Sequence, residues 1–191
     1  MDERKIFCPK SSLLHGDVIE SQLVTYNTEQ EVLQLQFHNP HTKKLEVDAS
    51  TAVVHIGDLW HDGKATWGVF VGPNSRYNAK GITCTGDFID AKLDALCVAE
   101  STIQKIYAHN NHVKNFIIAT DSDLYMVMSS WADNGGKSAK GNPVPFADKF
   151  MPLYNRLFPN AANSRGSTVR FWYVSDERNQ EARELAQQAM G

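Results

Sequence analysis

The order of apolar runs after Ala52 constrains the fold of this 191-residue chain more than any other sequence feature. Three strand-like runs come first, and a segment from Asp87 to Tyr107 follows with apolar residues at helical spacing. A buried strand, two helix-like segments, a last strand and a terminal helix complete the series. Three consecutive strands followed by crossovers through helices predict an α/β fold, with a mixed five-stranded sheet and helices on both faces.

The first fifty residues are polar, and we interpret 1–50 as an extension of a domain that spans 51–191. Residues 31–37 and 44–47 flank a turn-rich segment, which is typical of a β-hairpin. Alternation in the first of these runs gathers its leucines on one face. This apolar face should pack on the main domain or on a second subunit, so the hairpin also suggests a homodimer.

Charge and cysteine usage exclude several classes of protein. The formal net charge of −3 provides no overall positive field for holding nucleic acid. Cys8, Cys84 and Cys97 are widely separated and odd in number, which indicates buried free thiols instead of a disulfide framework or a zinc site. No signal-like start and no apolar run of about 18 residues are present. We therefore expect a cytoplasmic or nuclear protein without membrane contact.

Three motifs in the larger segment resemble the type 1 ribonuclease H family. They are "WGVFVGPNSRYNAKG" at 67–81, "FIIATDSDLYMV" at 116–127 and "WADNGGKSAKGNPV" at 131–144. Weaker matches extend the resemblance from Ala52 to the C-terminus. The resemblance implies a ribonuclease H-like fold. It also implies four carboxylates that hold paired Mg²⁺ ions, which in this family drive cleavage of RNA in RNA–DNA hybrids.

Two of the four acidic positions implied by the resemblance carry cations. Asp58 ends the run "VVHIGD" and Asp121 lies in "TDS", and both match the acids of the family. The glutamate of the first helix aligns with Lys92, and the aspartate of the terminal helix aligns with Arg183 in "VSDERNQEARELA". The catalytic carboxylates of the family are thus reduced to two remnants.

A shifted helical register is the alternative to these assignments. Asp90 or Asp94 would then supply the missing acid of the first helix, and Glu181 or Glu184 that of the last. A shift of two residues turns a helical side chain by about 200° and would point Leu93 away from the sheet. We therefore keep the register that places cations at both positions.

The substituted set has a different net charge from the family's site. Four acids carry −4, whereas Asp58, Asp121, Lys92 and Arg183 sum to zero. A cation about 4 Å from a carboxylate attracts it by about 4 kcal/mol at an effective dielectric of 20. Our hypothesis is that these residues form ion pairs and that no cofactor is needed. The alternatives are an active Mg²⁺-dependent nuclease with a rearranged site, and a transition-metal site that adds His61.

The surface that contacts substrate in the family also differs here. Phe88 and Phe146 align with polar substrate-contacting positions, and Trp60 lies in a loop that approaches the substrate in the family. An apolar patch of this kind is typical of a protein interface. Lys137 and Lys140 would give weak contacts to an RNA–DNA hybrid or double-stranded RNA. We therefore predict a catalytically inactive ribonuclease H-like domain that binds nucleic acid or protein.

Overall fold

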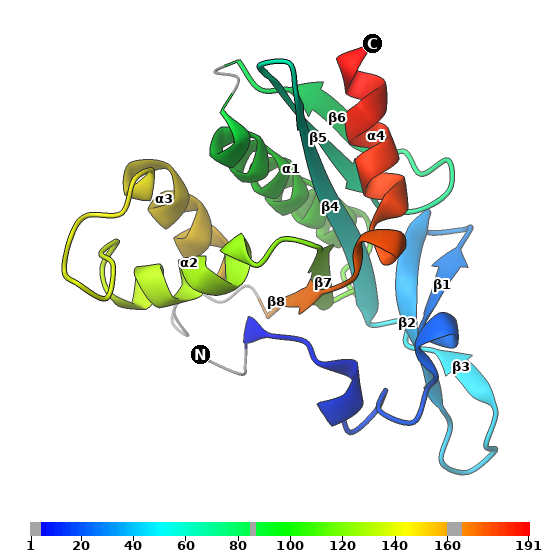
Figure 1. Ribbon diagram of the computed structural model, residues 1–191. Helices are drawn as coiled ribbons and strands as arrows, with labels where there is room; N and C mark the ends of the chain where they lie inside the picture. Colours follow the sequence, from blue (N-terminus) through cyan, green and yellow to red (C-terminus); the bar gives the residue numbers. More distant parts are fainter. Residues whose placement is uncertain (1–4, 85–86, 160–165) are drawn as a thin grey trace.

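The computed structural model describes residues 5–84, 87–159 and 166–191 (Figure 1). Within these residues eight strands form one mixed sheet, accompanied by four α-helices. The strands are β1 (Val24–Asn27), β2 (Val32–His38), β3 (Leu45–Val47), β4 (Thr51–His61), β5 (Lys64–Phe70), β6 (Ala79–Ile82), β7 (Asn115–Thr120) and β8 (Thr168–Tyr173). The helices are α1 (Phe88–His109), α2 (Leu124–Asp133), α3 (Ala147–Leu157) and α4 (Gln180–Met190).

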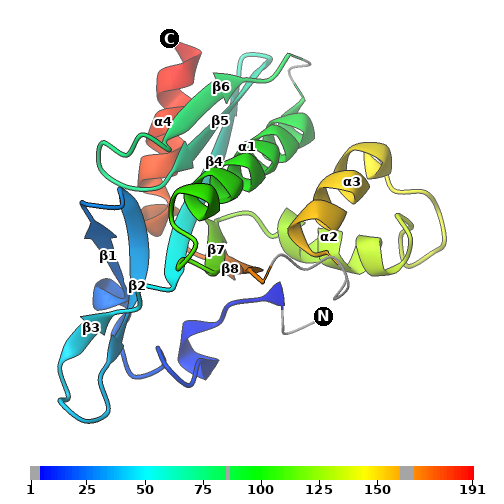
Figure 2. The ribbon, with the colours of Figure 1, turned by 180° about the vertical axis from the view of Figure 1, so that it is seen from behind.

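The five predicted strands are β4 to β8, and they follow the predicted order of strands and helices. β4, β5 and β6 pair antiparallel in succession, whereas β7 pairs in parallel with both β4 and β8. The two views show α1 and α4 on opposite faces of this sheet, with α2 and α3 beside its β7–β8 end (Figures 1 and 2). The predicted α/β fold class is confirmed.

β4 lies at the centre of the sheet, and its sequence reflects burial on both sides. Ala52, Val54 and Ile56 belong to the apolar cluster that also contains α1. Val53 points to the other face and joins a second cluster with Trp172 of β8. A strand covered on both faces is a near-continuous apolar run, which explains why this segment shows no polar alternation before its end.

The N-terminal segment continues the main sheet. β2 and β3 form the predicted hairpin, with Gln36 opposite Val47. β2 also pairs with β1, which the sequence did not reveal, and it meets β4 where Leu33 lies opposite Val53. The sheet therefore has eight strands and not the five expected. β5 pairs with β4 only from His55 onward, so the start of β4 can pair with β2 on that side. The apolar face of the hairpin packs on the main domain, where Leu35 is fully buried.

The three cysteines contradict the prediction of buried thiols. Cys8, Cys84 and Cys97 are free and exposed. Cys8 and Cys84 lie in connecting segments outside the strands, and Cys97 directly follows the buried Leu96 on α1. The side chain after a buried helical residue is rotated by about 100°, which turns Cys97 off the packed face. No helix in the described ranges is long and apolar enough to cross a bilayer.

Candidate functional site at the ends of β4 and β7

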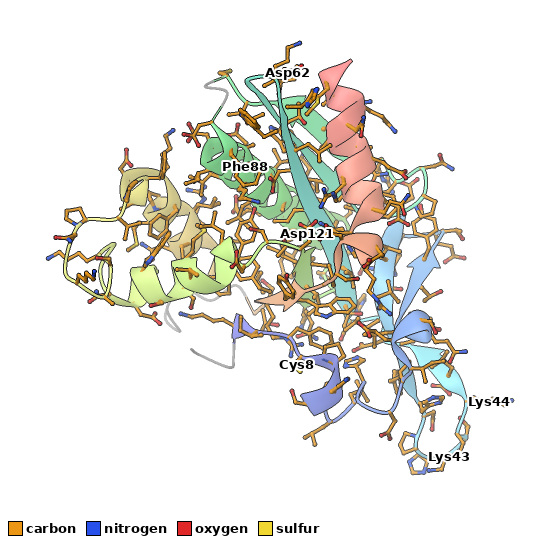
Figure 3. All side chains as sticks on the ribbon, viewed as in Figure 1. Cys8, Lys43, Lys44, Asp62, Phe88 and Asp121 are labelled. Atoms are coloured by element: carbon orange, nitrogen blue, oxygen red, sulfur yellow. The ribbon has the colours of Figure 1, made fainter. Side chains whose placement is uncertain are left out.

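Parallel pairing brings the two predicted aspartates together. Ile56 of β4 lies opposite Thr120 of β7. Asp58 comes two residues after this pair and Asp121 one residue after it, so both carboxylates stand at the same edge of the sheet. Figure 3 shows Asp121 near the start of α4, with Phe88 at the start of α1. The site therefore forms where two strands end between two helices.

Close contact between α4 and the sheet places Arg183. The side-chain amide of Asn179 donates to the carbonyl oxygen of Ile56 at 2.8 Å, which joins the start of α4 to β4. A Cβ atom on Gly57 would lie 2.9 Å from the backbone nitrogen of Arg183, and one on Gly68 would lie 2.1 Å from a carbonyl oxygen of α4. Only glycine allows this approach, so the two glycines bring the helix onto the strands.

Lys92 and Asp58 form a buried ion pair. The ammonium of Lys92 donates to Oδ1 of Asp58 at 2.7 Å, and the two side chains are 9% and 6% exposed. The same ammonium lies 4.1 Å from the ring centroid of Phe88, a cation–π contact. Burial raises the pKa of Asp58 and outweighs the opposite effect of Lys92. The pair is therefore held in a poorly solvated environment.

Tyr125 is hydrogen-bonded to the backbone of α1 at Lys92. Its hydroxyl donates to the backbone carbonyl of Lys92 at 2.9 Å. Burial raises the pKa of Tyr125 well above its ordinary value, and the negative charges of Asp58 and Asp121 add to this effect. The hydroxyl consequently remains protonated and serves as a donor at any physiological pH.

Arg183 forms the second ion pair, which is more open. Its Nη1 atom donates to Asp121 at 3.1 Å and to Asp176 at 3.0 Å. The Arg183 side chain is 37% exposed and that of Asp176 is 72% exposed. The sequence did not single out Asp176, although it lies in the motif "VSDERNQEARELA" that carries Arg183. Both cations thus contact the aspartates with which they were predicted to pair.

The alternative acids of α1 point elsewhere. Asp90 pairs with Lys149 of α3, and Asp94 accepts a hydrogen bond from the hydroxyl of Thr83 at 2.8 Å. The structure therefore places Lys92, and neither neighbouring aspartate, beside Asp58.

The other alternative acids and the proposed metal ligand also lie apart from the paired aspartates. Glu184 accepts from the side chain of Gln180 at 2.8 Å, on the exposed side of α4. His61 is the last residue of β4, and its Nε2 atom lies 3.2 Å from Oδ2 of Asp62, with both side chains strongly exposed. Within the described part of the chain, no group of three or more His, Cys, Asp or Glu residues is placed to hold a metal ion.

The ion pairs line a hollow of about 670 Å³, which we call the acidic hollow. Its charged lining consists of Lys92, Arg183, Asp58, Asp121, Asp123 and Asp176. Trp60 and Phe88, which are 57% and 44% exposed, stand at its rim. Both were predicted as binding residues. Asp123 was missed because it lies next to the "TDS" motif and has no counterpart among the acids that the resemblance implies.

Phe146 lies apart from the other two predicted aromatic residues. It is partly buried, has a left-handed backbone with φ of 65°, and precedes α3. It lines a second cavity of about 230 Å³, which we call the apolar hollow. Other residues of this lining are Ile89, Leu124, Met128, Trp131, Val144 and Phe150. The sequence predicted that Trp60, Phe88 and Phe146 form one apolar patch. In the structure they line two hollows instead. Lys137 and Lys140 are exposed in the nearby loop.

Comparison with known proteins identifies the fold. No family model and no curated protein matches the sequence. Among solved structures, a ribonuclease H1 isolated from compost by a metagenomic approach matches with a TM-score of 0.53 and 16% identity, over 72% of this chain and 93% of the other.

Two further structures with nucleic acid bound are similar. A foamy viral protease–reverse transcriptase in complex with double-stranded DNA has a TM-score of 0.51 and 16% identity, over 74% of this chain and 93% of the other. The compost enzyme in complex with an RNA/DNA hybrid has a TM-score of 0.51 and 13% identity, over 72% and 94%. The chain therefore has the ribonuclease H-like fold that its motifs predicted.

Proposed function

We propose that this protein is a catalytically inactive ribonuclease H-like domain that acts by binding. The observation that carries the proposal is the Lys92–Asp58 ion pair, which occupies the position where the fold's metal-dependent enzymes need converging carboxylates. Arg183 engages Asp121 in the same way. Two divalent ions do not fit this set of residues, because the two cations already neutralise the two aspartates.

The burial of Lys92 adds an energetic argument. For a metal ion to coordinate Asp58, the ammonium would have to leave a carboxylate at 2.7 Å and a side-chain environment that is only 9% exposed. Separating a buried ion pair costs about 3–5 kcal/mol, because an uncompensated charge stays behind. A metal ion would also meet the repulsion of Arg183 beside Asp121. The site therefore favours its internal ion pairs over divalent ions.

Two observations support a binding role. Trp60 and Phe88 are large apolar side chains that remain exposed beside the acidic hollow, as is common at recognition surfaces. In addition, the compost ribonuclease and the viral reverse transcriptase with this fold have been solved with nucleic acid bound. Lys137 and Lys140 are exposed and provide positive charge for weak phosphate contacts in this chain.

A cleavage assay tests the inactive state. The protein is incubated with a labelled RNA–DNA hybrid and Mg²⁺ or Mn²⁺, alongside the double variant Lys92→Glu, Arg183→Asp and the variant Asp121→Asn. We expect no cleavage by the natural sequence with either ion. Turnover by the natural sequence that disappears in Asp121→Asn would refute the proposal. Loss of activity in Asp121→Asn would also exclude a contaminating nuclease as the source of the turnover.

A further inference from the structure

We propose that the acidic hollow binds a basic side chain, arginine or lysine, of a partner protein. This inference rests on the proposed function and specifies its partner. Nucleic acid and metal ions are the competing occupants. The lining charges, the exposed aromatic rim and the adjoining apolar hollow argue for the basic protein segment.

The charge of the acidic hollow favours a cationic occupant. Its lining holds four carboxylates and two cations, which leaves a formal charge of −2. Lys92 and Arg183 are already hydrogen-bonded to Asp58, Asp121 and Asp176. An excess of negative charge along the lining of a hollow repels the phosphates of a nucleic acid and attracts an ammonium or guanidinium group.

Asp123 is the carboxylate best placed to receive that group. It is exposed, lines the hollow and precedes α2, where its side chain makes no capping hydrogen bond. Asp176, which is 72% exposed, shares a single Arg183 nitrogen with Asp121 and retains accepting capacity. An incoming guanidinium therefore finds carboxylate oxygens without first breaking the buried Lys92–Asp58 pair.

The aromatic rim suits the same kind of group. Lys92 already lies over the ring of Phe88, so one cation–π contact is built into the hollow. Trp60 is 57% exposed at the rim and offers the aromatic face that binds cations most strongly. Tryptophan and arginine are both enriched among the residues that contribute most of the binding energy at protein interfaces.

The apolar hollow indicates a second anchor on the same partner segment. Ile89 and Leu124 line both hollows, so the two adjoin each other. The apolar hollow has a volume of about 230 Å³ and a lining that is apolar apart from Ser138. A cavity of about 150 Å³ accepts benzene, so one large apolar side chain fits here. The partner segment should therefore carry a basic residue close to a large apolar one.

The four tryptophans allow a direct test by NMR, because each gives one indole N–H signal. Trp60 reports on the acidic hollow and Trp131 on the apolar hollow, whereas Trp67 and Trp172 line neither. The probe is the capped tetrapeptide Phe-Gly-Arg-Gly, titrated into the full-length protein to several millimolar. We expect the Trp60 and Trp131 signals to shift and the other two to stay. The variants Trp60→Phe and Trp131→Phe assign the signals.

Matched peptides and variants separate the two anchors. Phe-Gly-Glu-Gly should leave the Trp60 signal in place, and Ser-Gly-Arg-Gly should leave that of Trp131. Asp123→Asn should weaken the binding of the arginine peptide by about fivefold, the size expected for one partly exposed ion pair. Asp62→Asn removes an exposed carboxylate that lies outside the hollow, and asparagine tolerates its positive φ of 50°. This control should change the affinity by less than about 1.5-fold.

Three outcomes would overturn the inference. One is the absence of a Trp60 shift with the arginine peptide, and another is an equal shift with the glutamate peptide. The third is a short RNA–DNA hybrid, or Mg²⁺ alone, that shifts Trp60 at lower concentration than the peptide. If the hybrid is also cleaved, the proposed function fails as well. If it is not cleaved, only the assignment of the partner fails.

Discussion

The two ion pairs of the site join groups of the same kind in different surroundings. Lys92 and Asp58 are 9% and 6% exposed, and the lysine has no other carboxylate partner among the described residues. Arg183 is 37% exposed and divides its contacts between Asp121 and the exposed Asp176. Lys92 thus contacts one aspartate and Arg183 contacts two, and only in the first pair are both side chains less than 10% exposed.

Burial, more than charge, therefore sets the contribution of each pair to stability. An exposed pair contributes about 0–1 kcal/mol because water screens it. Loss of one partner from a buried pair is far more damaging, since it leaves a charge without compensation. We therefore expect loss of Lys92 alone to be strongly destabilising and loss of Arg183 alone to cost less.

The largest effect should follow from Lys92→Met. It leaves the Asp58 carboxylate buried without its cation, and the free energy of unfolding should fall by about 3–5 kcal/mol. Urea denaturation measures this loss. Adding Asp58→Asn should recover most of it, because the double variant has no buried charge. Lys80→Met changes an exposed lysine of β6 and should cost less than about 0.5 kcal/mol. Equal losses in Lys92→Met and Lys80→Met would show that the buried ion pair contributes no more to stability than an exposed lysine.

A smaller effect should appear in the stability cost of Lys92→Met, which should depend on pH. Burial already raises the pKa of Asp58 above its ordinary value of 3.8, and loss of Lys92 should raise it further. A raised pKa in the folded state means that protonation favours folding, so the cost of Lys92→Met is greatest at neutral pH. It should be smaller by about 1 kcal/mol or more at about pH 4.5.

Denaturation of both proteins over this pH range measures the difference between them. Titrations shared by the natural sequence and the variant cancel in that difference. A penalty that stays constant with pH would mean that Asp58 does not carry the buried charge.

The smallest effect is expected from Arg183→Met. Arg183 and Asp176 are open to solvent, but Asp121 is only 11% exposed and loses a cation, so the loss should be at most about 1.5 kcal/mol. It should also shrink in 1 M salt, where the screening length is about 3 Å. Thermal unfolding at low and high salt checks both points. A loss above about 2 kcal/mol that salt does not reduce would place this pair in the same class as the buried one.

Most of the architecture could be predicted from sequence because strand and helix periods leave direct traces in it. The run from Ala52 to Asp58 is apolar because β4 is covered on both faces, and the leucines of α1 recur at helical spacing. β1 left no such trace, since its four residues are all partly buried and show no alternation. The cysteines were misjudged because residue type alone does not report which way a side chain points.

The residues of the candidate site could also be predicted only in part from sequence. The resemblance to ribonuclease H motifs supplied Asp58, Asp121, Lys92 and Arg183, and the structure places them in two pairs. It did not supply Asp123 or Asp176, because nothing in a local motif says that the start of α2 and the turn before α4 face one hollow. Phe146 looked equivalent to Phe88 in sequence, yet it lines the neighbouring cavity.

The amino-acid sequence was enough to establish the chain order of strands and helices, and it predicted both the ribonuclease H-like fold and the pairing of two cations with two aspartates. These properties depend on residue type and spacing, which a linear chain displays fully. The burial of Lys92, the openness of Arg183 and the gathering of four carboxylates around one hollow follow from tertiary packing alone. Burial and clustering arise when distant segments pack together, and the strength of every charge in this site depends on how much water that packing leaves beside it.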